Sequence, residues 1–341
     1  MRSPFPLSPS RRVARGFVEA IGDTPHIVLP KLSAALGRTI VGKAEFLNPG
    51  GSVKDRAGRA IVEDAEASGR LQSGGTIVEG TAGNTGIALA LIANARGYRC
   101  IICIPDDQSP EKIALLRVYG VDVRVIGAVP FANPENYYHV ARRIAEATPG
   151  AIWADQFNNL ANRRAHETTT GPEIWEAFGA ELTAFGTSAG TGGTFAGTAR
   201  FLKAQHPALR TVLIDPEGSS LYCYATAGTL ETSGDSNIEG IGIKRITDNF
   251  QGAPVDAALR IDDRAAIEMA HWLLREEGLF LGGSAALNVV GAARYARTLP
   301  AGSSVLTILC DGGERYRSRI YDPQWLAENE CAPQTRDLSF L

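Results

Sequence analysis

The chain has 341 residues, 44% of them apolar, which favours about two domains with substantial hydrophobic cores. Its formal charge of −3 at pH 7 lacks the basic excess typical of proteins that bind nucleic acid or anionic membranes. No run is suited to a membrane span or to the core of a signal peptide. A small molecule is therefore the expected ligand.

Five cysteines at irregular spacing do not indicate a disulfide framework. Cys100 and Cys103 form a CxxC, but they lie inside the apolar run CIICI, which is typical of a buried strand rather than a redox loop or a zinc site. The five histidines are scattered without paired-ligand spacing, so no metal is expected. We therefore expect a reducing, cytoplasmic setting.

The first residues, MRSPFPLSPSRRVARG, are rich in Pro, Ser and Arg and contain no acid. A transit peptide has such a composition, but a flexible arm over residues 1–18 is the simpler interpretation.

Beyond this arm the pattern alternates strands with helices. Caps mark two of the helices: Ser109 and Pro110 start one that ends before Gly120, and Asp262 or Asp263 starts another that stops near Gly278. Repeated βα units predict an α/β fold with parallel-rich sheets flanked by helices, and such sheets bind ligands at the carboxyl ends of their strands. The expected strands are TIVE (76–79), CIICI (100–104), VDVRVI (121–126), TVLID (211–215) and SVLTILC (304–310).

The first candidate loop is NPGGSVKDR (48–56), which follows the expected strand IVGKAEFL (40–47) and precedes the helix DRAGRAIVEDAEASG (55–69). Lys54 would lie near a helix N-terminus, where the positive end of the dipole disfavours a protonated ammonium. A depressed pKa suits an amine that forms a Schiff base. A solvated lysine at a helix start is the alternative.

The second loop, EGTAGNTG (79–86), lies between a strand and the helix IALALIANARG. Its small residues expose backbone N–H groups at a helix start, which suits a carboxylate or a phosphate. Asn84, Thr81 and Thr85 add directional hydrogen bonds. Alone, the loop is equally typical of a tight turn.

The third loop, TSAGTGGTFAG (187–197), follows the strand LTAFG and opens a helix. No GK[ST] ends it, which excludes a Walker motif, and Phe195 stands where Rossmann spacing needs a third glycine. The loop has no cation. Backbone N–H groups, helped by the Thr191 and Thr194 hydroxyls, therefore favour a monophosphate.

The fourth loop is GGSAALN (282–288), after LREEGLFL and before the helix NVVGAARYARTL. Ser284 either caps that helix or faces a ligand. A reactive lysine, an anion cradle without cations, an asparagine and a serine hydroxyl are together the groups needed to hold pyridoxal phosphate.

At this point the sequence resembles the fold-type II pyridoxal-phosphate enzymes, and among them the cysteine synthase (O-acetylserine sulfhydrylase) and cystathionine β-synthase group. The likeness runs in collinear order from AIGDTP at residue 20 to CDGGERY ending at residue 316, through NPGGSVKDR, GNTG, DQFNN, TTGPEIW, GTGGT and EGIG. It implies a two-domain α/β fold like that of the tryptophan synthase β subunit, with the cofactor in the interdomain cleft. A smaller mobile domain would span 45–158, a larger one 19–44 and 159–325, and a tail 326–341.

The resemblance also implies roles for single residues. Lys54 would form the internal aldimine with pyridoxal 5′-phosphate and move the Cα proton, Asn84 would hydrogen-bond the cofactor's 3′ oxygen, and Ser284 would face the pyridine nitrogen. The phosphate would be held by Gly190, Thr191, Gly192, Gly193 and Thr194. The substrate carboxylate would be held by Thr81, Ala82, Gly83, Thr85 and Gln156, with Gly240 in the wall of the pocket.

A neutral serine does not hold the pyridine protonated, so the ring is a weaker electron sink and loss of a β substituent is favoured over transamination. The implied reaction is β-replacement on an activated L-serine: O-acetyl-L-serine and sulfide give L-cysteine and acetate through an aminoacrylate. The alternatives are a β-eliminating lyase such as a cysteine desulfhydrase, β-replacement with another nucleophile, and a non-catalytic relative that binds an acyltransferase tail. The family further implies a homodimer, with a serine acetyltransferase tail as a further candidate partner, and no nucleic-acid or membrane partner.

Several residues depart from the family pattern. Ala82 stands where cysteine synthases usually have serine, and Ala286 replaces a common glycine. DGG at 311–313 stands where many relatives have a serine, and His26 replaces an apolar residue. Extra methyl groups near the pocket would change which β substituent or nucleophile fits.

Overall fold

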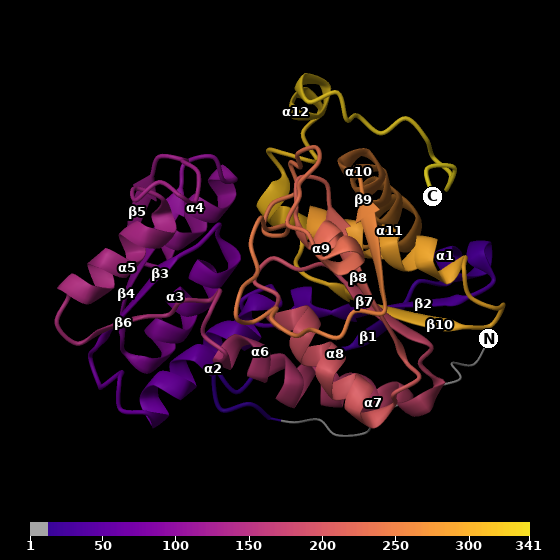
Figure 1. The fold of residues 1–341 in the computed structure, drawn as a ribbon. Coiled ribbons are helices and arrows are strands. Elements are labelled where there is room, and N and C mark those ends of the chain that lie inside the picture. The colour runs from indigo at the N-terminus through magenta and orange to yellow at the C-terminus, as the bar shows by residue number, and fades with distance from the viewer. Residues whose placement is uncertain (1–12) are drawn as a thin grey trace.

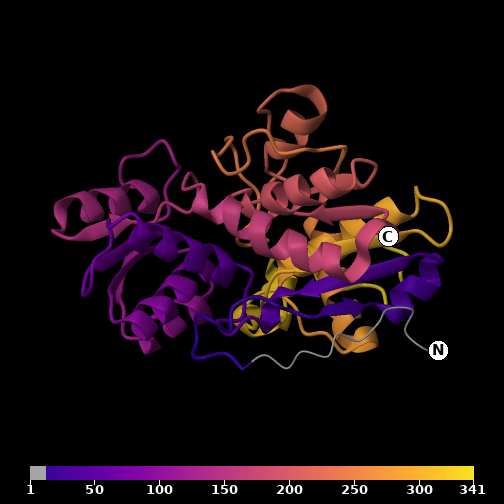
Figure 2. The same ribbon diagram turned by 90° about the horizontal axis from the view of Figure 1, so that it is seen from below.

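The computed structural model describes residues 13–341, so most of the arm expected over residues 1–18 lies outside the described part (Figure 1). Within that part the strands form a six-stranded and a four-stranded sheet. Figure 2, turned by 90°, shows the same two bodies side by side, and the labels of Figure 1 show that the elements from α2 to β6 make most of the smaller one. None of the described helices is long and apolar enough to cross a membrane.

The larger sheet has the strand order β1-β2-β10-β7-β8-β9, with β1 antiparallel to β2 and all other neighbours parallel. Alternate residues of a strand face opposite sides, so Ile40 packs into the core under α10 and α11 while Val41 packs into the core under α7 and α8. The strands are β1 (His26–Val28), β2 (Thr39–Ala44), β7 (Ala184–Thr187), β8 (Arg210–Pro216), β9 (Ala257–Ile261) and β10 (Ser304–Leu309). The helices are α1 (Pro30–Leu36), α7 (Gly171–Phe178), α8 (Gly193–Gln205), α9 (Leu221–Ala227), α10 (Asp263–Trp272), α11 (Gly283–Ala296) and α12 (Pro323–Glu328).

The smaller sheet has the order β5-β4-β3-β6, and all its strands are parallel. Ile77 packs toward α2 and α3, whereas Val78 packs toward α5 on the other face. The strands are β3 (Thr76–Gly80), β4 (Arg99–Pro105), β5 (Asp122–Ile126) and β6 (Ala151–Trp153). The helices are α2 (Lys54–Ala67), α3 (Asn84–Arg96), α4 (Pro110–Val118) and α5 (Tyr137–Ala147), and α6 (Ala161–Ala165) leads back to the larger body.

The five expected strands are confirmed as β3, β4, β5, β8 and β10, and so is the α/β class with parallel-rich sheets. The helix cap at Asp262 is confirmed, because its side chain accepts a hydrogen bond from the N–H of Ala265 at 2.8 Å. Ser109 stands at the N-cap of α4 but makes no capping hydrogen bond there. The domain boundaries at residues 45 and 158 stay a prediction.

Two expectations were wrong in their bounds. The strand expected over 40–47 ends at Ala44, and Glu45–Leu47 forms a 3-10 turn that directs the Glu45 carboxylate inward. The loop expected over 282–288 is mostly helix, because α11 begins at Gly283. Gly282 is its cap residue, so Ser284 lies in the first turn rather than at the cap. The Ala-Ala-Leu that follows Ser284 has strong helix propensity, which explains the early start.

All five cysteines are free, and all except Cys223 are buried. Cys100 and Cys103 lie on β4, where burial raises the pKa of each thiol to about 12. A thiol with so high a pKa is almost entirely protonated at neutral pH and is a poor nucleophile.

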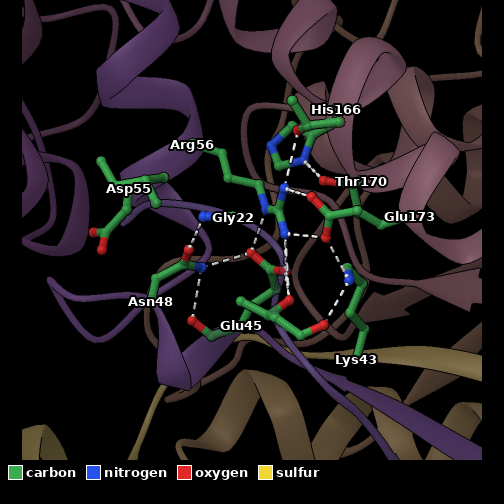
Figure 3. Close-up of polar contacts among 12 residues, drawn as sticks. Gly22, Lys43, Glu45, Asn48, Asp55, Arg56, His166, Thr170 and Glu173 are labelled. Carbon is green, nitrogen blue, oxygen red and sulfur yellow. Dashed lines mark hydrogen bonds and ion pairs between the residues drawn. The ribbon is translucent and has the colours of Figure 1, made fainter. Parts of the chain in front are cut away.

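A buried ionic cluster holds the start of α2 against the larger body (Figure 3). Arg56 donates through Nε and one terminal nitrogen to both carboxylate oxygens of Glu45, each at 2.8 Å. It also donates to both carboxylate oxygens of Glu173 on α7, at 2.6 and 2.7 Å. Lys43 on β2 adds an ion pair to Glu173 at 2.6 Å, so two cations face two anions.

The cluster also fixes the segment that precedes β1. The Thr24 hydroxyl donates to Glu45 at 2.6 Å, and its carbonyl accepts from Lys43 at 3.0 Å. Burial alone would raise the pKa of Glu45, but the charge and hydrogen bonds of Arg56 outweigh it and lower that pKa to about 2. The pKa of Glu173 is lowered as well and that of Arg56 is raised, so these three groups stabilise one another as ions, whereas burial lowers the pKa of Lys43.

We expect Arg56→Met to lower the free energy of unfolding by about 3 to 5 kcal/mol, because it leaves buried carboxylates without their main partner. Arg59→Met, three residues along the same helix, is the matched control. Arg59 pairs with Glu63 at the surface, where such pairs contribute about 0.3 to 0.5 kcal/mol. Urea unfolding of both variants measures the difference, and equal losses would contradict a special role for the cluster.

Two histidines make stability depend on pH: His166 is fully buried and His26 is partly buried. Burial lowers the pKa of His26 and of His166 to about 3. The positive charge of Lys43 lowers the pKa of His26 further, and that of Arg56 does the same for His166. Below pH 6.5 the unfolded chain therefore binds protons that the folded chain does not, so stability falls as the pH falls from 6.5 toward 3. Glu45, with its lowered pKa, keeps its contribution until the pH falls below about 4.5 toward 2.

Replacing His26 by leucine should reduce this acid sensitivity. Between pH 7 and pH 5 the wild type should lose about 1 to 2 kcal/mol more unfolding free energy than His26→Leu, because about 1.4 kcal/mol accompanies each pH unit below the unfolded pKa. Urea titrations at the two pH values give the comparison. Equal losses in both proteins would mean that His26 is protonated in the folded state.

Candidate active site

The predicted site residues converge on one cavity between the two sheets, at the carboxyl ends of their strands. The cavity has a volume of about 200 Å³, and a smaller recess adjoins it under the loop after β7. Lys54, Gly190 and Thr191 line both spaces. The other predicted residues that line the cavity are Thr81, Ala82, Gly83, Asn84, Thr85, Gln156, Gly240 and Ser284, and those that line only the recess are Gly192 and Thr194. Gly193 lines neither space.

Lys54 is the first residue of α2 and is half-buried at the junction of the two spaces. The preceding residue is fixed because the N–H of Val53 donates to the carbonyl of Cys310 at 2.9 Å. Asp55 closes the loop by accepting from the N–H of Gly50 at 2.6 Å, and burial raises the pKa of Asp55 to about 7. The Lys54 side chain thus lies where a single ligand that fills both the cavity and the recess would contact its amine.

The loop after β3 faces the cavity with hydroxyl and amide groups. Thr85 donates to the side-chain oxygen of Gln156 at 2.5 Å, and Gln156 donates to the carbonyl of Gly80 at 3.3 Å. Glu79 accepts a hydrogen bond from the N–H of Gln156 at 3.4 Å and is fully buried. This burial raises the pKa of Glu79 well above its ordinary value, and the charge of Asp155 adds to the effect.

The recess combines a glycine turn with the N-terminus of α8. Gly192 has φ +85°, and a side chain there would lie 2.5 Å from Cβ of Phe250. Gly193 starts the helix, and its missing side chain leaves room for Asn162, which donates to the Thr191 hydroxyl at 2.9 Å. The first N–H groups of a helix have no partner inside it, so they suit a bound anion.

The Ser188 side chain tests whether a phosphate fits this recess. Its hydroxyl is buried, lines the recess and makes no hydrogen bond in the protein. A buried hydroxyl without a partner is costly unless a ligand or water satisfies it. Residues 187–194 contain no lysine or arginine, as expected for an anion held by N–H and hydroxyl groups alone. Together with the nearby Lys54, these features fit pyridoxal phosphate.

A charged pair at the cavity was not predicted. Lys112 on α4 forms a 2.5 Å ion pair with Glu239, although the two residues are 127 positions apart. Both line the cavity, and their side chains are only 1% and 11% exposed. The ammonium also lies 4.5 Å from the centre of the Tyr316 ring. Nothing in the local sequence indicates such a contact, which joins the smaller body to the loop beside Gly240.

Cys310 and Ser188 are further lining residues that the sequence did not single out. Cys310 lies at the end of β10 and lines both spaces. Burial raises the pKa of its thiol to about 11, although the nearby charge of Lys54 acts in the opposite direction. Tyr137, Phe157 and Ile241 add apolar surface to the cavity. The two serines of the site come from different elements: Ser188 lies in the loop after β7, and Ser284 lies in the first turn of α11.

Comparison with known proteins agrees with this geometry. Residues 18–311 match the model of the family described as pyridoxal-phosphate dependent enzyme. A protein of Neurospora crassa named cysteine synthase 1 is 51% identical over 94% of this chain and 87% of its own length. Cystathionine beta-synthase of Oryctolagus cuniculus is 38% identical over 94% of this chain and 59% of its own.

Solved structures show the same fold. The O-acetylserine dependent cystathionine beta-synthase from Helicobacter pylori superposes with a TM-score of 0.83 at 36% identity, over 91% of this chain and all of that one. O-ureido-L-serine synthase gives a TM-score of 0.84 at 34% identity, over 93% of this chain and all of that one. With a family match over most of the chain and a cavity that fits the cofactor, the chain belongs to the pyridoxal-phosphate dependent enzymes.

Proposed function

We propose that this enzyme is a cysteine synthase, which replaces the acetoxy group of O-acetyl-L-serine with sulfide to form L-cysteine and acetate. The observation that carries the proposal is the position of Lys54 at the junction of the cavity, which Thr81, Thr85 and Gln156 line, and the recess under the loop after β7. The relatives named cysteine synthase in Neurospora crassa and Emericella nidulans, each 51% identical over 94% of this chain, support the choice of reaction.

Pyridoxal phosphate, when bound, supplies an aldehyde for the amino group of the substrate and a ring that makes the Cα proton acidic. The Ser188 and Thr191 side chains and the N-terminus of α8 would hold its phosphate in the recess. Asn84 would hydrogen-bond its 3′ oxygen, and Ser284 would face its pyridine nitrogen. A hydroxyl at that nitrogen does not hold it protonated, which favours loss of a β substituent over transamination.

The substrate carboxylate is bound by Thr81, Thr85 and Gln156 at the N-terminus of α3, where the helix dipole favours an anion. Lys54, which lines the cavity, would remove the Cα proton with its amine. Acetate leaves from Cβ with its bonding electrons, hydrosulfide forms the new bond at the same carbon, and Lys54 returns the proton to Cα. The Lys112 side chain packs against Gly83, so the ion pair with Glu239 lies beside this carboxylate pocket.

The oligomeric state, the compartment and the partners belong to the same proposal. We propose a homodimer in a reducing compartment, the cytoplasm, and five free cysteines support the reducing conditions. One relative, from Saccharomyces cerevisiae, is named a putative mitochondrial cysteine synthase. A desulfhydrase activity, another nucleophile and an acyltransferase tail as partner stay predictions.

Incubation with O-acetyl-L-serine separates the proposed reaction from elimination. With sulfide present we expect cysteine to form in proportion to the acetate released, and without sulfide we expect little pyruvate. Quantifying the amino acid and the keto acid in the same samples gives the answer. Pyruvate formed at the same rate with or without sulfide would identify a β-eliminating lyase instead.

Lys54→Ala should abolish the visible absorbance that the wild type gains on adding pyridoxal phosphate, because no imine can form. Cysteine formation should fall by about 10³-fold or more, in line with the 10²–10⁴-fold typical of a lost general base together with the lost covalent link. Lys31→Ala is the control, because Lys31 is 57% exposed in a surface ion pair. Unchanged absorbance in Lys54→Ala would exclude this lysine as the covalent attachment site.

A further inference from the structure

We propose that Asp311 and Arg315 are positioning residues, which fix the Asn84 side chain so that it presents an N–H rather than its oxygen to the cofactor. The inference rests on the proposed placement of pyridoxal phosphate beside Asn84. It concerns residues of the segment that follows β10, where the sequence departs from the family pattern.

The contacts of Asn84 leave little freedom to its amide. Arg315 donates to Oδ1 of Asn84 at 2.6 Å, and Nδ2 of Asn84 donates to Oδ2 of Asp311 at 2.6 Å. Asp311 is fully buried, and Arg315 is 7% exposed. Asn84 itself lines the cavity. The amide therefore lies between a buried anion and a buried cation.

The two flanking groups determine the orientation of the amide chemically. A guanidinium can only donate hydrogen bonds, so it must face the amide oxygen. An ionised carboxylate can only accept, so it must face the amide nitrogen. A flipped amide would place its N–H groups against those of the Arg315 guanidinium and its oxygen against the Asp311 carboxylate. One N–H of Asn84 then remains for a ligand in the cavity, and that ligand must offer an acceptor.

Asp311 and Arg315 are themselves held by several elements of the site. The Tyr316 hydroxyl donates to the same oxygen of Asp311 at 2.6 Å. The carbonyl of Asp311 accepts from the N–H of Gly282 at 3.0 Å, next to the helix that carries Ser284. Arg315 also donates to the carbonyl of Gly50, in the loop that carries Lys54. The orientation of Asn84 is thus coupled to both of these loops.

The expected effect on the cofactor follows from hydrogen bonding to an ionised oxygen. An N–H donor stabilises the ionised form of the 3′ oxygen and lowers its pKa, whereas an amide oxygen at the same place would destabilise that form. Charge-assisted hydrogen bonds also contribute to binding, commonly by a factor of ten or more. Loss of the orientation should therefore change both the spectrum of the bound cofactor and its affinity.

The test compares Asp311→Asn, Arg315→Met and the double variant with Asn84→Ala. Asparagine at position 311 keeps an acceptor, and Arg315 still fixes the amide oxygen of Asn84. The dissociation constant of pyridoxal phosphate for Asp311→Asn should therefore lie within about twofold of the wild-type value. In the double variant nothing fixes the orientation of the Asn84 amide, so this variant should bind pyridoxal phosphate about tenfold more weakly than the wild type, as Asn84→Ala should. Arg315→Met should lie between them. Arg317→Met, an exposed position on the same segment, is the control.

The readouts are the dissociation constant of pyridoxal phosphate and the pH dependence of its absorbance on the protein, measured without substrate. In an Asn84→Ala background, Asp311→Asn should change neither quantity further, and Arg315→Met should have a smaller effect than in the wild type, because only its hydrogen bond to Gly50 is then lost. Equal effects of Arg315→Met in both backgrounds, or wild-type values in the double variant, would overturn the proposal. If the double variant fails to fold, Arg315→Met with and without Asn84→Ala decides the question. Cysteine formation by the wild type tests the proposed reaction separately.

Discussion

The position of Lys54, the proposed Schiff-base lysine, depends on one buried arrangement. In it the guanidinium of Arg56, two residues further along α2, lies between Glu45 and Glu173. Arg56 ties the first turn of α2 to the larger body, while Ile61 and the later residues of the helix pack into the core of the smaller one. Gly58 allows this close packing, since a side chain there would lie 3.2 Å from Cβ of Ala88. The helix therefore joins the two bodies at the lysine itself, and the cavity that they form is built around its N-terminus.

The segment after β10 has a comparable function on the opposite side of the cavity. Within six residues it contacts the Lys54 loop through Cys310, the Ser284 helix through Asp311 and the loop after β3 through Arg315. The geometry of the site thus depends on a short segment that supplies few groups to the ligand directly.

Local sequence patterns predicted the strands and the loops at their ends, because hydrophobic runs and glycine-rich turns are properties of consecutive residues. The start of α11 was predicted too late, because the pair Gly282–Gly283 is typical of a loop, whereas the helix already begins at Gly283. Partners of charged residues could not be predicted, because Arg56 and Glu173 are 117 positions apart and meet only in the folded chain. The same holds for Lys112 with Glu239 and for Arg315 with Asn84. Ser188 was not predicted, because its hydroxyl stands out only by being buried without a hydrogen-bond partner, and the sequence does not show burial.

The free thiols have a further consequence for an enzyme that consumes sulfide. Hydrosulfide and cysteine cleave disulfide bonds by thiol exchange, so a crosslinked protein would be weakened by its own substrate and product. In this chain all five cysteines are unpaired, and tertiary structure rests on packing and buried ion pairs that neither compound attacks. The stability of the fold is accordingly independent of the concentration of the reducing agents that the proposed reaction handles.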